Sequence, residues 1–297
     1  MIFNRPQNMT DALRFAAAKR VLSLSPSVGT RELEESLAPQ IRERAFYSAR
    51  TPYAGYLADV SNQITRMVQP DVRITPEGLI PTGPGESISP AQVRARMKQT
   101  LAALGYQPDP DKRGGLQDLS SDRRVNLIID TNLKMARGYG QWRESQDSTV
   151  LDIWPADELY RALSRRAERD WQGRWNEARA ALGSATTATI ARSSAGPFVA
   201  LKNDPIWQKI SRFGNPYPPF DFGSGMRVRD VARRRAVELG VIREQSRPPA
   251  PARDPLNEEF EVETGNMPAG ILQALRTALA GVLQQRAGKL FITPAGV

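Results

Sequence analysis

The sequence contains neither cysteine nor histidine. Without them the chain can form no disulfide bond, hold no thiolate-bound zinc or iron–sulfur centre, and use neither a thiolate nucleophile nor an imidazole general base. Carboxylate chemistry with Mg²⁺ stays open because hard cations take oxygen ligands, but no local motif gathers the Asp and Glu residues that it needs. We therefore expect no enzyme, no catalytic residue, no metal site and no cofactor.

Long apolar runs are also missing from the sequence. No stretch approaches the ~20 apolar residues that cross a bilayer. Residues 1–22 interleave charged and polar side chains with apolar ones, unlike the apolar core of a signal peptide. We expect neither a membrane span nor a membrane partner.

Acidic residues are fewer than basic ones, with 32 Asp and Glu against 41 Lys and Arg, which gives a formal net charge of +9 at pH 7. This excess favours polyanionic partners such as nucleic acid. The alternative is that this charge is spread over the whole surface and only keeps the protein soluble. With 297 residues, of which 40% are hydrophobic, the chain is long enough for one large domain or two small ones.

Apolar residues at helical spacing predict a mostly helical chain with irregular loops and one short sheet. In the first half, Ser89 is expected to cap a helix that has Pro90 at its first position and stops at Gly105. The helices expected there cover residues 10–25, residues 30–68 with a break near Pro52, residues 90–104 and residues 119–136.

The second half of the chain is expected to alternate helices with loops. Its expected elements are a long Arg-rich helix over residues 155–182, a short strand or anchored loop at 198–201, a short helix with Trp207 and Ile210, a helix over 228–239 and an amphipathic helix over 267–283. Trp171 and Trp175 lie one helical turn apart, which favours a core position over a stacking platform for bases. The glycine pairs at 138–140 and 223–225 indicate turns.

Two breaker-rich segments suggest domain boundaries. Pro and Gly are dense over residues 69–90, and residues 247–255 hold several prolines, so we expect regions at 1–88, 89–245 and 246–297. The last region reads as a linker, a solvated acidic spacer (Asp254, Glu258, Glu259, Glu261 and Glu263) and the amphipathic helix. The apolar stripe of that helix needs a cover, either a groove on a partner or the core of the protein itself.

Five arginines form the strongest basic cluster, with only Asp230 opposing them: Arg227, Arg229, Arg233, Arg234 and Arg235. On one helix they would present dense guanidinium charge, which suits phosphate groups. The alternative is a solvated helix face that pairs with acidic residues elsewhere. The arginines of residues 161–179 are explained more simply, by ion pairs with acidic residues three or four positions away.

Residues 213–225 combine turn-forming residues with aromatic side chains of the kind that are usually buried. We expect an ordered loop with a structural role, anchored by Trp207, Phe213, Tyr217, Phe220, Asp221 and Phe222.

Three blocks of sequence follow one another in a characteristic order. Residues 127–132 (LIIDTN) precede Ala136 and Gly138, residues 204–207 (DPIW) come next, and residues 218–228 (PPFDFGSGMRV) close the series. In this order the chain resembles, over about residues 90–243, the Mu F-like phage head morphogenesis family, the minor head proteins.

In that family the third block carries a His and a Cys-Arg-Cys motif. Here Asp221 stands at the His position, Gly225 or Met226 and then Val228 stand at the Cys positions, and Arg227 stands at the Arg position. A metal or disulfide that involves the family's His and Cys residues therefore cannot form in this chain. The loop must be held by its aromatic residues and prolines.

The resemblance implies a helical N-terminal region at 1–88, followed by an α+β minor-head-protein module at 89–245 with long irregular loops. It further implies a structural virion protein at the portal vertex and the capsid interior, present in the host cytoplasm during assembly, that helps to package, retain or deliver DNA. Its expected partners are the portal protein, the major capsid or scaffold protein, and double-stranded DNA without sequence preference. Two alternatives stay open: a free sequence-independent DNA-binding protein, and a Mg²⁺-dependent nuclease or transferase whose carboxylates cluster only in the fold.

Overall fold

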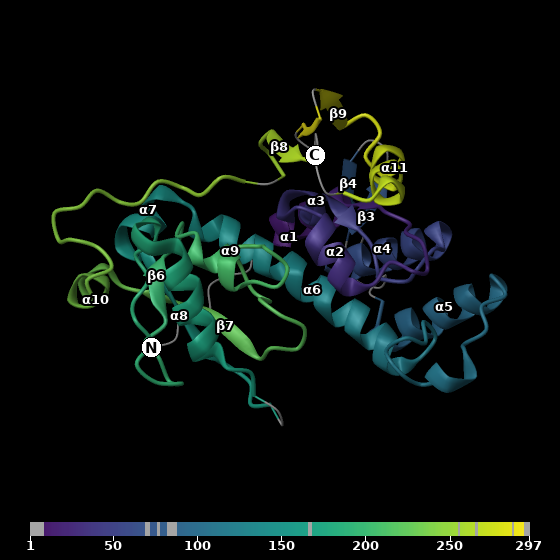
Figure 1. Cartoon of the computed structure of the whole chain (residues 1–297), viewed down its shortest axis with the longest axis horizontal. Helices are drawn as coiled ribbons and strands as arrows, with labels where there is room; N and C mark the ends of the chain where they lie inside the picture. The colour runs from purple at the N-terminus through teal and green to yellow at the C-terminus, as the bar shows by residue number, and fades with distance from the viewer. Residues whose placement is uncertain are drawn as a thin grey trace. The chain divides into compact units, whose positions relative to one another are not determined.

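The computed structural model describes residues 9–68, 72–75, 78–81, 88–165, 168–254, 256–264, 267–286 and 288–293 (Figure 1). The chain divides into two compact units. We call residues 138–254 the central unit, and residues 9–137 with the C-terminal segment 256–293 the terminal unit. Within the described residues the chain forms eleven α-helices and small sheets, 46% helix and 13% strand. A mixed α+β fold in which helices predominate agrees with the expectation, but the described residues form four small sheets where one was expected.

Short helices make up the first part of the terminal unit. Its elements are α1 (Met9–Ala18), β1 (Arg20–Val21), α2 (Thr30–Ser36), α3 (Pro39–Arg44), β2 (Ala45–Phe46), α4 (Ala54–Val68), β3 (Val72–Thr75), β4 (Gly78–Pro81), α5 (Pro90–Ala103), the short 3₁₀ helix Pro110–Lys112 and the start of α6 (Asp122–Ser145). The helical stretch expected over residues 30–68 thus consists of three helices, since Pro39 starts α3 anew and β2 pairs in parallel with β1. The break expected near Pro52 does precede α4.

The Pro- and Gly-rich stretch after α4 contains the antiparallel β3–β4 pair, and residues 69–71, 76–77 and 82–87 lie outside the described residues. The two helices on either side of it share one hydrophobic core. Val60 and Ile64 of α4, Val93 and Met97 of α5, and Val125 of α6 are all buried in this core. The units therefore do not divide here, where the composition suggested a boundary.

The start of α5 follows the sequence expectation closely. Ser89 is the N-cap, its hydroxyl accepts the Gln92 N–H, and the Gln92 side chain accepts the Ser89 N–H in return. Pro90 occupies the first helical position, and Gly105 just beyond the end has a φ of 72°. The expected N-cap and first-position proline are confirmed, because their determinants are local, and Gln92 adds the return hydrogen bond of a capping box.

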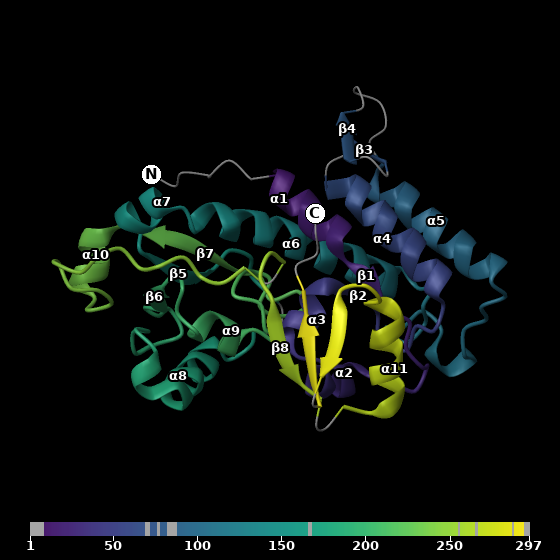
Figure 2. The ribbon, with the colours of Figure 1, turned by 90° about the horizontal axis from the view of Figure 1, so that it is seen from above.

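The C-terminal segment packs into the core of the terminal unit. It forms β8 (Phe260–Glu263), α11 (Ala269–Ala278), β9 (Leu283–Arg286) and β10 (Lys289–Ile292), and the strands join antiparallel in the order β8-β10-β9 (Figure 2). Ile271, Leu275 and Leu279 are buried together with Leu33 and Ile41 of the N-terminal helices. The apolar stripe of α11 is therefore covered by the core of the protein itself, which was one of the two alternatives. The helix is also shorter than expected, because residues 283–286 form a strand.

The acidic run before α11 is solvated only in part. Asp254 is buried, accepts the Tyr139 hydroxyl at 2.9 Å and pairs with the Arg143 guanidinium at 3.2 Å. Glu261 and Glu263 are exposed, as expected, but they lie on β8 and both pair with Lys289 on the neighbouring strand β10. The expectation was wrong for Asp254, because its partners are distant in sequence.

The central unit is built on one small antiparallel sheet. Its elements are the end of α6, α7 (Ser148–Ile153), β5 (Ala156–Arg161), α8 (Trp171–Leu182), the 3₁₀ helix Gly183–Ala185, β6 (Val199–Leu201), α9 (Ile206–Ile210), β7 (Met226–Val231) and α10 (Arg233–Glu238), with strand order β6-β5-β7. Leu159 and Met226 pack with Trp175 of α8 and Trp207 of α9 in the larger core. Trp171 and Trp175 are both buried, so their expected core position is confirmed.

The long helix expected over residues 155–182 is wrong. Its first part is strand β5, which pairs with β6 from Ala156 to Glu158 and with β7 along its whole length. Only residues from Trp171 onward are helical, after the Asp170 carboxylate caps the Gly173 N–H at 2.7 Å. Pairing with two strands that lie far away in sequence outweighs the helix propensity of this segment. The short strand expected at 198–201 is confirmed as β6.

The helix expected over residues 228–239 is also only partly present. Residues up to Val231 belong to β7, and helix α10 covers only Arg233–Glu238. The arginines of this region alternate along a strand first and then follow a short helix. They therefore do not form the single dense helix face that the sequence suggested.

Gly138 and Gly140 do not form a turn as expected, since both lie inside α6. A Cβ atom at Gly138 would lie 1.8 Å from the Pro218 carbonyl oxygen and 3.2 Å from Cδ2 of Tyr217. Glycine is required here because only a residue without a side chain lets the loop at 217–218 approach the helix so closely.

Candidate nucleic-acid interface

The five arginines singled out in the sequence lie on β7 and α10. Arg227 and Arg229 are exposed on β7, opposite Tyr160 and Glu158 of β5. Arg229 pairs with Glu158 at 2.8 Å, and its guanidinium lies 5.3 Å from the centre of the Tyr160 ring.

The three arginines of α10 also pair with carboxylates. Arg233 bonds the Asp152 carboxylate at 2.9 Å, while Arg234 and Arg235 share Glu238 at 3.8 and 2.9 Å. Among the described residues, no carboxylate lies within ion-pair distance of Arg227. For four of the five arginines, the structure therefore supports the alternative in which the charges pair with acidic residues.

The aromatic loop is anchored in two places, as its sequence suggested. Phe220 is fully buried and stacks on Trp207 with ring centres 5.9 Å apart, and Trp207 in turn packs edge-on against Trp175. Tyr217 is buried against Tyr139 and Trp142 of α6 at ring-centre distances of 5.8 Å.

The other two aromatic residues of the loop lie nearer the surface. Phe213 and Phe222 are half-buried and form an edge-on pair with ring centres 4.7 Å apart. After the anchors the chain turns sharply, and Gly223 and Gly225 have φ values of 55° and 71°. The turn expected at 223–225 is confirmed, and a Cβ at Gly225 would lie 2.4 Å from the Leu163 carbonyl oxygen.

Asp221 is the centre of a charged cluster that the sequence did not reveal. Its side chain is only 6% exposed, and three arginines surround it: Arg174 at 3.0 Å, Arg169 at 3.3 Å and Arg212 at 3.8 Å. The carboxylate also accepts the Phe222 N–H at 2.7 Å. We call Asp221, Arg169, Arg174 and Arg212 the Asp221 cluster.

Three separate segments supply this cluster. Arg169 precedes α8, Arg174 lies in the first turn of α8, and Arg212 follows α9 (Figure 1). Among the described residues, the ion pairs expected three or four positions apart within residues 161–179 are not found, since Arg161 bonds Glu168, seven positions away, at 3.3 Å. Arg169 and Arg174 are instead drawn to a carboxylate some 50 residues away, a pairing that leaves no local sequence signal.

A second buried charge lies on the sheet of the central unit. Lys202 is almost fully buried, and its ammonium bonds Asp157 of β5 and, at 2.6 Å, Asp230 of β7. These two carboxylates face each other in the strand register. The lysine separates two like charges that would otherwise repel, and a buried charge needs such partners. Among the described residues, no group of carboxylates is arranged to hold a metal ion.

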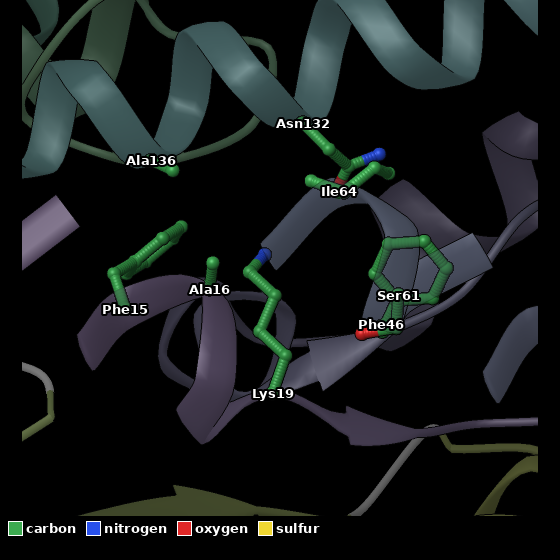
Figure 3. Close-up of a pocket in the computed structure, with 8 residues that line it drawn as sticks. All are labelled: Phe15, Ala16, Lys19, Phe46, Ser61, Ile64, Asn132 and Ala136. Carbon is green, nitrogen blue, oxygen red and sulfur yellow. The ribbon is translucent and has the colours of Figure 1, made fainter. Parts of the chain in front are cut away.

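A small pocket in the terminal unit is lined by residues of α1, β2, α4 and α6 around the Lys19 side chain (Figure 3). Its volume of about 10 Å³ is just enough for one water molecule. The Lys19 ammonium lies 4.5 Å from the centre of the Phe15 ring, and burial lowers the pKa of Lys19 to about 8, an effect that Glu43 partly offsets. The space beside this amine holds nothing larger than a water molecule.

No protein-family model, no curated protein and no solved structure matches the chain. In the part of the chain that the structure describes, no helix is both long enough and apolar enough to cross a bilayer.

Proposed function

We infer that the chain is a structural minor head protein of a tailed bacteriophage or prophage. In this role it associates with the portal vertex and the capsid interior, and it assists in packaging, retaining or delivering DNA. Its protein partners are the portal protein and the major capsid or scaffold protein. The proposal starts from the three ordered sequence blocks that resemble the Mu F-like family.

The contacts between these blocks are the observation that carries the proposal. Gly138 of the first block lies directly against Tyr217 and Pro218, next to and within the third block, and the absence of a side chain there permits the contact. Trp207 of the second block stacks on Phe220 of the third. Gly138 and Pro218, which are 80 residues apart, are thus brought together by residues that make up the resemblance, and this supports the proposal.

The departures from the family pattern are also explained by packing. Asp221, at the position of the family's His, is held by three guanidinium groups, and Gly225, near the first Cys position, permits the close approach of Leu163. The aromatic anchors Tyr217 and Phe220 hold the chain that leads into the turn. Ion pairs and buried rings therefore hold this loop in place of a metal or a disulfide.

The charge of the central unit supports a contact with DNA. Residues 138–254 contain 19 Lys and Arg against 14 Asp and Glu, a formal charge of +5 out of the +9 of the whole chain. A positive surface attracts the phosphate backbone irrespective of sequence. Contacts to the phosphate backbone carry no sequence information, so we expect binding without base preference.

Particle composition tests the proposal. Virions produced by the genome that encodes the chain are purified and analysed by quantitative mass spectrometry, and the chain is co-expressed with the portal protein of the same genome. We expect a few copies per particle and co-purification with the portal. Absence from both would refute the proposal, and if the free protein still bound duplex DNA, that result would favour a DNA-binding protein with no place in the particle.

A further inference from the structure

The Asp221 cluster differs from the ion pairs of α10 in the depth of its carboxylate. The Asp221 side chain is 6% exposed, whereas those of Arg169 and Arg212 are 41% and 40% exposed and that of Arg174 is 29% exposed. The negative charge thus lies beneath the guanidinium groups. A molecule that approaches from solvent meets the cations first.

The arginines of α10 show the opposite arrangement. Glu238, which they share, is 49% exposed, and Asp152, the partner of Arg233, is 58% exposed. There the carboxylates reach the surface and cancel the positive charge where a ligand would meet it. Proximity of basic residues in the sequence is therefore not sufficient to identify a phosphate-binding surface.

The guanidinium groups of the Asp221 cluster are also held in place before any ligand arrives. Arg169 donates from Nη2 to the Phe222 carbonyl at 2.7 Å, and Arg174 lies 4.9 Å from the centre of the Trp171 ring. Arg212 lies 5.5 Å from the centre of the Phe222 ring. A planar guanidinium carries five N–H donors, and Asp221 engages only a few of those available here. Little side-chain entropy remains to be lost when the other donors bind an anion.

The N-terminus of helix α8 does not itself provide the phosphate site, since the Asp170 carboxylate already accepts the Gly173 N–H there. The positive charge comes from the side chains. Arg165 extends the same basic region, because it is exposed and its Nε lies 3.2 Å from where a Cβ would stand at Gly225.

We propose that the Asp221 cluster binds a backbone phosphate of duplex DNA, with Arg169 and Arg174 as the principal ligands and Asp221 as the buried counter-charge that positions them. This inference rests on the DNA contact of the proposed function and locates it. Guanidinium groups suit phosphate because they donate two parallel hydrogen bonds to its oxygens. Phosphate contacts of this kind fix the position of a protein on the duplex and carry no sequence information.

Single substitutions in the full-length protein test the site. Arg169→Gln and Arg174→Gln each remove one charge from the cluster, and Arg234→Gln removes one charge from α10 of the same unit, as the matched control. Binding of a fluorescein-labelled duplex is measured by anisotropy over a series of salt concentrations. We expect the two cluster variants to bind about 3- to 10-fold more weakly at low salt, with the slope of log K against log salt reduced by about 1, while the control stays close to wild type.

Thermal melting of each variant shows whether folding is preserved. If Arg174→Gln unfolds, Arg169→Gln still tests the site, because Arg169 lies outside the helix. If Arg234→Gln weakens binding and Arg169→Gln does not, the site is wrong. If the wild type and all variants bind alike, the DNA contact lies elsewhere, which overturns the site but leaves the particle assignment standing. A wild type that does not bind the duplex overturns both the site and the DNA role, whereas incorporation into particles is measured separately.

Inorganic phosphate, added alone at constant ionic strength, distinguishes the two sources of the ligand. If it raises the melting temperature of the wild type but not of Arg169→Gln, while the duplex binds both proteins equally, the cluster takes free phosphate. That result would overturn the assignment to DNA.

Discussion

Replacement of Gly138 by alanine tests the contact that joins the first and third sequence blocks. Inside a helix, Gly→Ala ordinarily stabilises a protein by about 1 kcal/mol, because alanine loses less backbone entropy on folding. At Gly138 we expect the opposite sign, since the added Cβ would lie 1.8 Å from the Pro218 carbonyl oxygen and 3.0 Å from its carbon.

The size of the effect follows from the overlap. A carbon and an oxygen approach no closer than about 3.3 Å even in weak hydrogen bonds, so α6 and the loop would have to separate by about 1.5 Å. Both obstructing atoms belong to the backbone and cannot rotate away. Tyr217, which packs on Tyr139 and Trp142, would move with them. Overpacking of this kind costs about 1–3 kcal/mol, so we expect a net loss near the upper end of that range.

The distribution of tryptophan makes the assay specific for one unit. All 5 tryptophans lie within residues 138–254, so their fluorescence in a urea titration reports the unfolding of the central unit alone. Gly55→Ala, in the first turn of α4 with nothing within 4 Å of the new Cβ, is the matched control and should be neutral or stabilising. Because Gly55 lies in the terminal unit, which contains no tryptophan, the stability of this control is measured by circular dichroism in the same urea titration. An increase in stability for Gly138→Ala similar to the control would refute the close approach and remove the main support for the function.

The other predictions concern burial and charge. Lys19→Met should stabilise the terminal unit at pH 7, as measured by circular dichroism during unfolding. Burial lowers the pKa of Lys19 from 10.5 to about 8, so between these pH values the unfolded chain is protonated and the folded chain is not. The stability of the wild type should therefore rise with pH over this range, and that of the variant should not. Phe220→Ala should cost about 3–5 kcal/mol in a urea titration, and the half-buried Phe222→Ala clearly less; equal losses would contradict the two anchoring depths. Truncation after residue 254 should leave the tryptophan emission native-like. It should reduce the helical circular dichroism signal by more than the loss of α11 alone, because the N-terminal helices lose part of their core. A helical signal that falls only by the contribution of α11 would contradict the shared core.

The features that the sequence predicted correctly are those with local causes. The N-cap at Ser89, the turn at Gly223 and the buried tryptophan pair of α8 each depend on residues within a few positions of one another. The aromatic character of the loop likewise indicated that Phe220 would be buried. In all these cases a short segment contains the information that decides its conformation.

The features that the sequence could not predict depend on distant partners. Residues 156–161 have a helical pattern, but two other strands complete a sheet around them. Arg169 and Arg174 looked like members of a helix with its own ion pairs, but they converge on Asp221 because the loop folds over α8. Conversely, Arg234 and Arg235 are two of the five arginines expected to bind phosphate, but both pair with Glu238. The depth of a carboxylate below the surface has no signature in the sequence.

The discontinuous terminal unit has a consequence for the nascent chain. Vectorial synthesis makes α2 and α3 first, yet the side chains that cover Leu33 and Ile41 belong to α11 and β10, which leave the ribosome last. The central unit is continuous, so all its strands are already synthesised while the earlier helices still lack their cover. The part of the protein that begins first is thus completed last, and until then its apolar helices are targets for chaperones and for aggregation.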